Sequence, residues 1–344
     1  MITYGYSVQE GSDHFVNLAD TVMSNFALAG SPGTFMVDIV PVLQYLPKWL
    51  PGMRGYWKTM ASWRKETELM FDEPYQFAKA QFKNNGIVPS LVSLLLESEI
   101  SCTDEANIKL TAGSLYGAGA DTTVSANYSF LLAMTLNSSI QAKAQEEIDK
   151  VIGNSRLPTI ADRDNLPYIN ALVKEVFRWN SITPLGMPHR VIRDDIHKGY
   201  FIPKGSTVIV NAWHLLHDPD VYADPLSFNP NRFLGDNPER DPRKIVFGFG
   251  RRICPGICSA YFGFTDDSDV IEGLNLADTS VFIFCALSLA VFNVSKVVRD
   301  GVVVEPICEW ETGVVSHPKD FECSIKPRSA KARELILMEE DSLK

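Results

Sequence analysis

Residues 247–256 read Phe247-Gly-Phe-Gly250-Arg-Arg252-Ile-Cys254-Pro-Gly256, and this stretch says most about the fold. Glycines on both sides of one cysteine let the backbone wrap closely around a flat or bulky group. The cysteine precedes an apolar, helix-like segment, and the free N–H groups of a helix N-terminus stabilise a thiolate. Arg252 adds a positive charge that suits a carboxylate. The stretch predicts a thiolate ligand at Cys254; a tight structural turn with a buried cysteine is the alternative.

Two further segments carry candidate chemistry, although each is weak alone. Glu175-Val-Phe-Arg178 lies on a predicted helix, where the i,i+3 spacing puts both charges on one face. Ala118-Gly-Ala-Asp121-Thr122-Thr123 lies midway along a long predicted helix, and its glycine and threonines weaken helix propensity there. Threonine hydroxyls bond back to the preceding turn, which favours a local widening that admits a small molecule. The alternative is a tolerated irregularity in a core helix.

Four patterns in a fixed order identify a family resemblance. AGADTT at 118–123 is followed by ExxR at 175–178, FNPNRF at 228–233 and FxxGxRxCxG at 247–256. In this order they resemble the cytochrome P450 family, and its fungal microsomal type in particular. The resemblance extends over residues 2–328. It implies a mainly α fold with small β-sheets, a long helix around 104–135 over the haem site, and a single partial domain over 1–344.

The family's residue roles carry over to matching positions of this chain. The implied cofactor is haem b (iron protoporphyrin IX), and Cys254 matches the axial thiolate ligand of its iron, which favours O–O cleavage. Thr122 matches the distal-helix threonine that helps deliver protons to dioxygen, and Asp121 the acid beside it. Positions matched to binding the haem or packing beside the thiolate are Arg252, His189, Phe247, Gly250 and Gly256. Those matched to a structural ion-pair network are Glu175, Arg178 and Arg232.

The resemblance also implies the reaction and its partners. We expect a monooxygenase that inserts one oxygen atom of O2 into a hydrophobic small molecule, with electrons from NADPH-cytochrome P450 reductase. The substrate would contact the apolar segments 115–119, 183–187 and 312–315. One alternative is a catalytically silent remnant that binds haem weakly or not at all. Another is a non-enzymatic interaction protein that uses residues 34–53 as an apolar patch.

The chain departs from the family pattern in two places. We expect the family's N-terminal part to be missing, with its membrane anchor, several helices and much of the small β-domain. Endoplasmic-reticulum membrane association is therefore implied for full-length relatives only. The second departure is residues 257–273, which separate Gly256 from Leu274-Asn-Leu-Ala277; their removal restores the family spacing.

Our hypothesis for 257–273 is a translated, unspliced intron, and the alternative is a genuine loop insertion. The stretch would separate Cys254 from the following helix, whose partial charge acts only within its first turn. It also brings four acidic residues near the thiol, and negative charge raises a thiol pKa.

Composition narrows the class of protein further. A formal net charge of -10 over 344 residues argues against nonspecific nucleic-acid binding and against a polybasic membrane patch. Six scattered cysteines are no disulfide framework, and Cys254 with Cys258 lacks the second pair or histidine cluster of a zinc site. No signal peptide is expected at the N-terminus. The apolar run 281–294 is shorter than the roughly 20 residues of a spanning helix and predicts a core helix.

Apolar spacing and breakers give the remaining elements. Helices are predicted over 14–30, 55–84, 104–135, 138–152 and 168–180. Residues 199–205, followed by 207–210, predict a turn between two short strands. Residues 217–253 predict a long loop, either ordered or disordered. Short β-like pieces are predicted at 301–305, 309–315 and 321–327.

Overall fold

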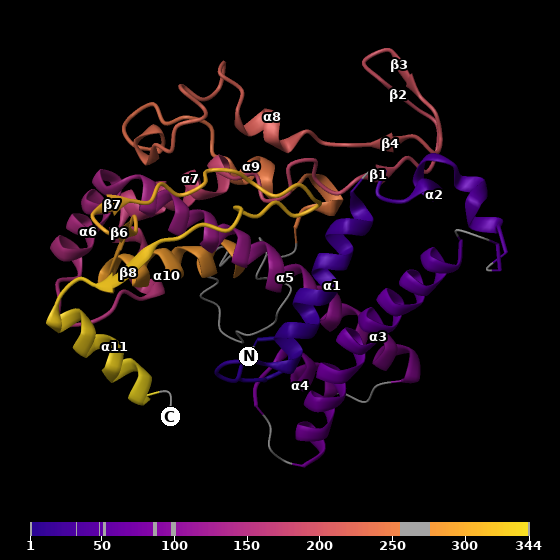
Figure 1. Cartoon of the computed structure of the whole chain (residues 1–344), viewed down its shortest axis with the longest axis horizontal. Helices are drawn as coiled ribbons and strands as arrows, with labels where there is room; N and C mark the ends of the chain where they lie inside the picture. The colour runs from indigo at the N-terminus through magenta and orange to yellow at the C-terminus, as the bar shows by residue number, and fades with distance from the viewer. Residues whose placement is uncertain are drawn as a thin grey trace. The chain divides into compact units, whose positions relative to one another are not determined.

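The computed structural model describes residues 2–31, 33–47, 49–50, 53–84, 88–97, 101–254 and 276–342 (Figure 1). Over these residues the chain is mainly helical with small antiparallel sheets, which confirms the predicted fold class. Gly256 and the stretch 257–273 lie outside the described residues, so the hypotheses about them stay predictions.

Helices account for most of the described chain. The α-helices are α1 (His14–Gly30), α2 (Met36–Ile39), α3 (Met53–Lys83), α4 (Leu91–Leu96), α5 (Cys102–Leu136), α6 (Ser138–Val151), α7 (Pro167–Trp179), α8 (Ala212–Leu216), α9 (Arg243–Val246), α10 (Leu276–Val291) and α11 (Ala330–Ser342). Short 3-10 helices are η1 (Pro41–Tyr45), η2 (Ile160–Asn165), η3 (Pro230–Phe233) and η4 (Gly250–Arg252). All five long helices predicted from apolar spacing are present, within two residues of the expected ends.

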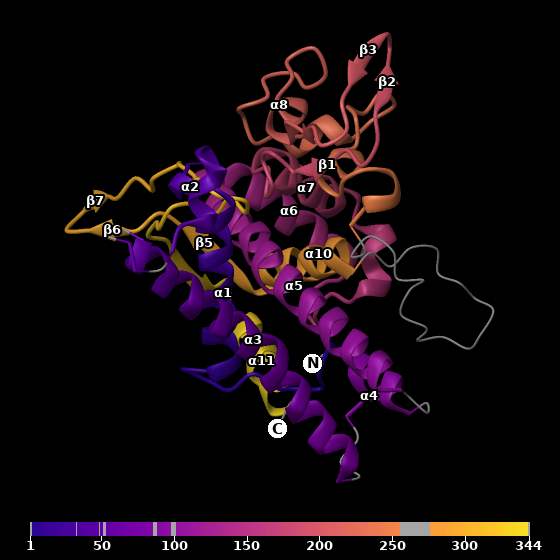
Figure 2. The same ribbon diagram turned by 90° about the vertical axis from the view of Figure 1, so that its right-hand side faces the viewer.

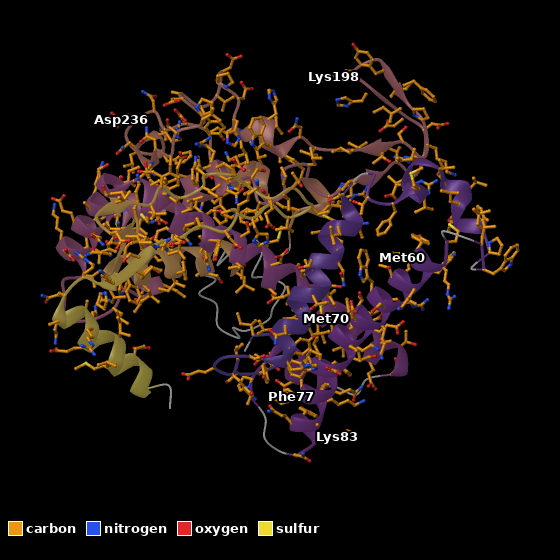
Figure 3. All side chains as sticks on the ribbon, in the orientation of Figure 1. Met60, Met70, Phe77, Lys83, Lys198 and Asp236 are labelled. Carbon is orange, nitrogen blue, oxygen red and sulfur yellow. The ribbon has the colours of Figure 1, made fainter. Side chains whose placement is uncertain are left out.

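The strands are short and pair in twos. They are β1 (His189–Arg190), β2 (Asp195–His197), β3 (Tyr200–Ile202), β4 (Thr207–Val208), β5 (Phe292–Ser295), β6 (Val298–Arg299), β7 (Val302–Val303) and β8 (Ser324–Pro327). β3 and β4 flank the expected turn, but β3 pairs with β2 and β4 with β1. The β2–β3 hairpin projects with Lys198 at its tip (Figure 3). Lys198 and Gly199 both adopt the left-handed conformation, which the tight turn of the hairpin needs.

The described chain divides into two compact units, Met1–Thr122 and Thr123–Lys344, and α5 contributes to both. The expectation of one partial domain over the whole chain stays a prediction. The first unit is built on α1 and α3, which pack through Ala19, Val22 and Met70. Met60, Met70, Phe77 and Lys83 mark the length of α3 in Figure 3.

The second unit has the larger core. α6, α7 and α10 contact one another and lie close together in both views (Figures 1 and 2). The predicted core helix in the apolar run 281–294 is α10, whose Val281, Phe282, Cys285 and Leu289 are buried. No helix among the described residues combines the length and the apolar character that crossing a membrane requires.

The expected loop over 217–253 contains η3, α9 and η4, and sequence reasoning also missed α8, β5 and α11. The short helices span only one or two turns and β5 only four residues, which is too few for a periodic pattern. α11 is different, because its thirteen residues hold only one buried side chain that the structure describes, Ala332. A helix without a buried stripe gives little apolar periodicity.

Candidate active site

The cysteine motif folds as a closed loop. The backbone N–H of Cys254 donates to the carbonyl oxygen of Phe247 at 2.7 Å, so the two ends of the loop meet. Gly248 and Gly250 have φ angles of 78° and 59°, in the left-handed region that other residues adopt at a cost. A Cβ on Gly248 would meet the Arg252 carbonyl oxygen only at the ordinary contact distance of 3.5 Å, so the backbone conformation and not the space favours glycine there. The glycines therefore set the path that turns the chain back to Cys254.

The cysteine loop, residues 247–254, packs against the apolar core of the second unit. Phe247 is buried, and its ring packs edge-on against Phe177 of α7 with centroids 5.4 Å apart. Both belong to the main core cluster of this unit, and Cys254 packs against that cluster. Two other apolar side chains of the loop, Phe249 and Ile253, remain 47% and 41% exposed. The cysteine thus packs against the apolar core, and part of the apolar surface of its loop stays uncovered.

Glu175, Arg178 and Arg232 come together as a buried ion-pair network. Arg178 is fully buried and binds both carboxylate oxygens of Glu175 at 2.8 Å. Arg232, from η3, reaches Glu175 Oε1 at 3.2 Å, and the backbone N–H of Asn229 donates to the same oxygen at 2.7 Å. One glutamate therefore joins α7 to the segment that precedes the cysteine loop.

Both arginines also bind loop carbonyls. Arg178 donates to the backbone oxygens of Leu216, Pro225 and Ser227 at 2.7–3.1 Å. Arg232 donates to those of Ala223, Asp224 and Ser227 at 2.7–3.3 Å. Buried charges of this kind are stable only when hydrogen bonds replace the lost water. The network thus gives the irregular segment 216–232 a single conformation.

The network contains a residue that the motifs do not name. Glu239 Oε2 accepts from Arg232 Nη1 at 2.7 Å, and its Oε1 accepts the Ala223 N–H at 3.1 Å. Burial alone would lower the pKa of Arg232, but attraction to Glu175 and to Glu239 outweighs it and raises the pKa. Charge counting could have signalled this residue, because two buried arginines and one glutamate leave a positive charge unbalanced.

The remaining candidate residues of this unit lie at its surface. Arg252, in η4, is exposed. His189 is exposed in β1, where it pairs with Val208 of β4. In the expected substrate segment 183–187, Leu185 and Met187 are exposed. Gly250 begins η4, whereas Gly256 lies outside the described residues.

Asp121 and Thr122 belong to the first unit, where α5 continues as α-helix through both residues. Thr122 Oγ1 donates to the carbonyl oxygen of Ala118 at 2.7 Å, the back-bond that the sequence predicts. The carbonyl is thereby given a second partner. The hydroxyl keeps its two acceptor lone pairs for another donor.

Comparisons with known proteins agree with this arrangement of motifs. The family model described as Cytochrome P450 matches residues 1–261. Cytochrome P450 monooxygenase 208 of Postia placenta (strain ATCC 44394 / Madison 698-R) is 52% identical over 338 residues, 97% of this chain and 62% of that protein. Cytochrome P450 monooxygenase claR of Ampulloclitocybe clavipes is 44% identical, covering 97% of this chain and 60% of that protein.

A third relative, cytochrome P450 monooxygenase ppsD of Aspergillus oryzae (strain ATCC 42149 / RIB 40), is 41% identical over 345 residues. The comparison covers 97% of this chain and 62% of that protein. The chain thus spans about three fifths of the length of these curated relatives.

Proposed function

Because this chain belongs to the cytochrome P450 family, we propose that it serves a haem-thiolate monooxygenase reaction. One oxygen atom of O2 would enter a hydrophobic small molecule, with electrons from NADPH-cytochrome P450 reductase. The observation that carries the proposal is the closed loop from Phe247 to Cys254, whose single cysteine packs against the apolar core that contains Phe247 and Phe177. Haem b would be the cofactor, and Cys254 the ligand of its iron.

The residues around Cys254 fit such a group. A cysteine sulfur is a known axial haem ligand, and the exposed Phe249 and Ile253 offer apolar surface for a flat ring to cover. Arg252 and His189 are exposed donors that suit the carboxylates of haem. When bound, the haem supplies the electron and oxygen chemistry that no side chain provides.

This chain's own residues have separate tasks in the proposal. Glu175, Arg178 and Arg232 hold the segment before the cysteine loop, and Phe247 would pack beside the sulfur. On α5, Thr122 would hold a proton at Oγ1, and Asp121 beside it would supply protons from water. The apolar segments 115–119, 183–187 and 312–315 would bind the hydrophobic substrate and exclude water.

The test is a spectrum of the full chain expressed with a haem precursor, reduced and exposed to carbon monoxide. We expect the red-shifted Soret band of thiolate ligation, because Cys254 would be the ligand. Cys254→Ala should abolish this band. Cys308→Ser is the matched control, since Cys308 is an exposed cysteine outside the loop, and it should leave the band unchanged.

The opposite results favour a different function. If the parent chain gives no such band, or if Cys254→Ala keeps it, the ligand assignment is wrong. A folded chain that retains no haem would support the alternative of a catalytically silent remnant.

A further inference from the structure

The first turn of α10 carries a buried carboxylate that two arginines from other elements bind. Asp278 is 3% exposed. Its Oδ2 accepts from Arg163 Nη2 at 2.6 Å and from Arg243 Nη1 at 3.2 Å. Arg163 belongs to η2 and Arg243 begins α9. Asp278 therefore ties the start of α10 to two segments that precede it in the chain.

Arg243 stands at the base of the cysteine loop. α9 ends at Val246, and the next residue, Phe247, accepts the hydrogen bond from Cys254 that closes the loop. Asp241 fixes the Arg243 guanidinium, with Nη2–Oδ2 at 2.6 Å and Nε–Oδ1 at 3.0 Å. Burial alone would lower the pKa of Arg243, but the two carboxylates raise it, so Arg243 keeps its charge.

Arg163 strengthens the same link from the other side. Its guanidinium lies over the ring of Phe282, 4.8 Å from the ring centroid. Phe282 follows Asp278 by one turn of α10. Its Nε also donates to Asn170 Oδ1 of α7 at 2.8 Å. Arg163 thus contacts α10 at two successive turns and is itself held by α7.

We propose that Asp278 is a positioning residue for Cys254: through Arg243 it holds the first turn of α10 against the base of the cysteine loop. The inference rests on the proposed function, because the position of a helix start relative to the sulfur matters when that sulfur is a thiolate. The link joins described residues on either side of 255–275. The cysteine motif ends at Gly256 and assigns Asp278 no role.

The test is hydrogen exchange, measured by mass spectrometry on the full chain without haem. The Cys254 amide is the reporter, since it donates to Phe247 only while the loop is closed. Asp278→Asn keeps the size of the side chain and removes its charge. We expect exchange of the Cys254 amide to speed up about tenfold, because local opening no longer breaks an ion pair.

Asp149→Asn is the matched control, because it cuts an ion pair near the opposite end of α10. Asp149 binds Arg328 through both its oxygens, and Arg328 also reaches the carbonyl oxygens of Leu289 and Ala290. This variant should leave exchange at Cys254 unchanged. Asp278→Glu, which keeps the charge, should restore most of the protection.

Two results would overturn the proposal. One is unchanged exchange at Cys254 in Asp278→Asn. The other is equal acceleration at Cys254 and along α7, which would mean a general loss of stability. Arg243→Gln cuts the same link from the other side and decides the question if Asp278→Asn does not fold. Because the readout needs no haem, a negative result here is distinct from a missing Soret band.

Discussion

Asp13 shows how a single residue fixes the start of a helix. Its carboxylate accepts hydrogen bonds from the Gln9, Phe15 and Val16 amides and from the Tyr6 hydroxyl. The hydrogen bond from Gln9, followed by that from Tyr6, lowers the pKa of Asp13 from 3.8 to about 2. The Asp13 carboxylate therefore binds a proton less readily in the folded chain than in the unfolded chain.

The pH dependence follows from that direction. A carboxyl group with a lowered pKa contributes stability that is complete above its ordinary value and lost as pH falls through the folded value. We expect the free energy of unfolding of the parent chain to exceed that of Asp13→Asn above pH 3.8, and the difference to shrink towards pH 2. Urea unfolding of both chains at several pH values measures it.

Tyr6→Phe serves as the control for this prediction. It removes one of the hydrogen bonds that lower the pKa of Asp13 in the folded chain, so the pH-dependent loss of stability should be smaller and should be complete at a higher pH. A difference between parent and Asp13→Asn that stays constant over this pH range would contradict the assignment.

At the residue scale, the motifs identified some residues of the candidate site and missed others. Glu175, Arg178 and Arg232 were chosen by pattern, and the structure brings their charges within 3.2 Å. Glu239 and Asp278 carry no motif, because each acts through a tertiary contact whose partner lies elsewhere in the sequence. The roles of Thr122, His189 and Arg252 stay predictions, since they concern a group that the residues would bind.

At the element scale, helix packing in the first unit depends on one glycine of α5. A Cβ on Gly113 would lie 2.3 Å from Phe71 Cδ1 of α3, closer than atoms approach without displacement. Gly119, also in α5, is exposed and has nothing within 4 Å of its Cβ position. The two positions therefore separate close packing from helix propensity.

Alanine at these two glycines should change stability in opposite directions. Gly113→Ala overpacks the contact with Phe71 and should destabilise the chain by about 1–3 kcal/mol. Gly119→Ala should stabilise it by about 0.5–1 kcal/mol, since alanine loses less backbone entropy in a helix. Urea unfolding midpoints at constant slope measure both. Changes of the same sign would contradict the close packing at Gly113.

Element prediction succeeded where a pattern ran for several turns. The apolar spacing of 14–30 predicts α1 with its observed bounds. The apolar run 281–294 predicts α10, which buries Val281, Phe282, Cys285 and Leu289, but the helix ends at Val291 and the rest of the run belongs to β5. The pairing of β3 with β2 was not predictable from local pattern, since strands of two or three residues have no register signal. The order of the four motifs predicted the fold class, which the pattern of no single helix or strand did.

At the scale of the whole molecule, the departure from the family pattern after Gly256 bears most directly on the proposed haem binding. Asp278, in the first turn of α10, binds Arg243 of α9, so this link joins described residues on either side of 255–275. A chain without residues 257–273 would run Cys254-Pro-Gly-Leu-Asn-Leu-Ala, with the family spacing restored. The deletion therefore removes four acidic residues while keeping the anchor on either side.

We expect the deletion to raise the fraction of haem-bound chain that gives the red-shifted Soret band with carbon monoxide. The helix start would then follow Cys254 closely, and its partial charge acts only within the first turn.

Neutralising Asp266, Asp267, Asp269 and Glu272 in the full chain is the control, because it removes the negative charge and leaves the length. If spacing is the cause, that variant should gain less than the deletion. A deletion that loses the band while the parent keeps it would make 257–273 a genuine part of the site. Mature transcripts that still encode Tyr261 to Asp269 would reject the intron hypothesis independently of either spectrum.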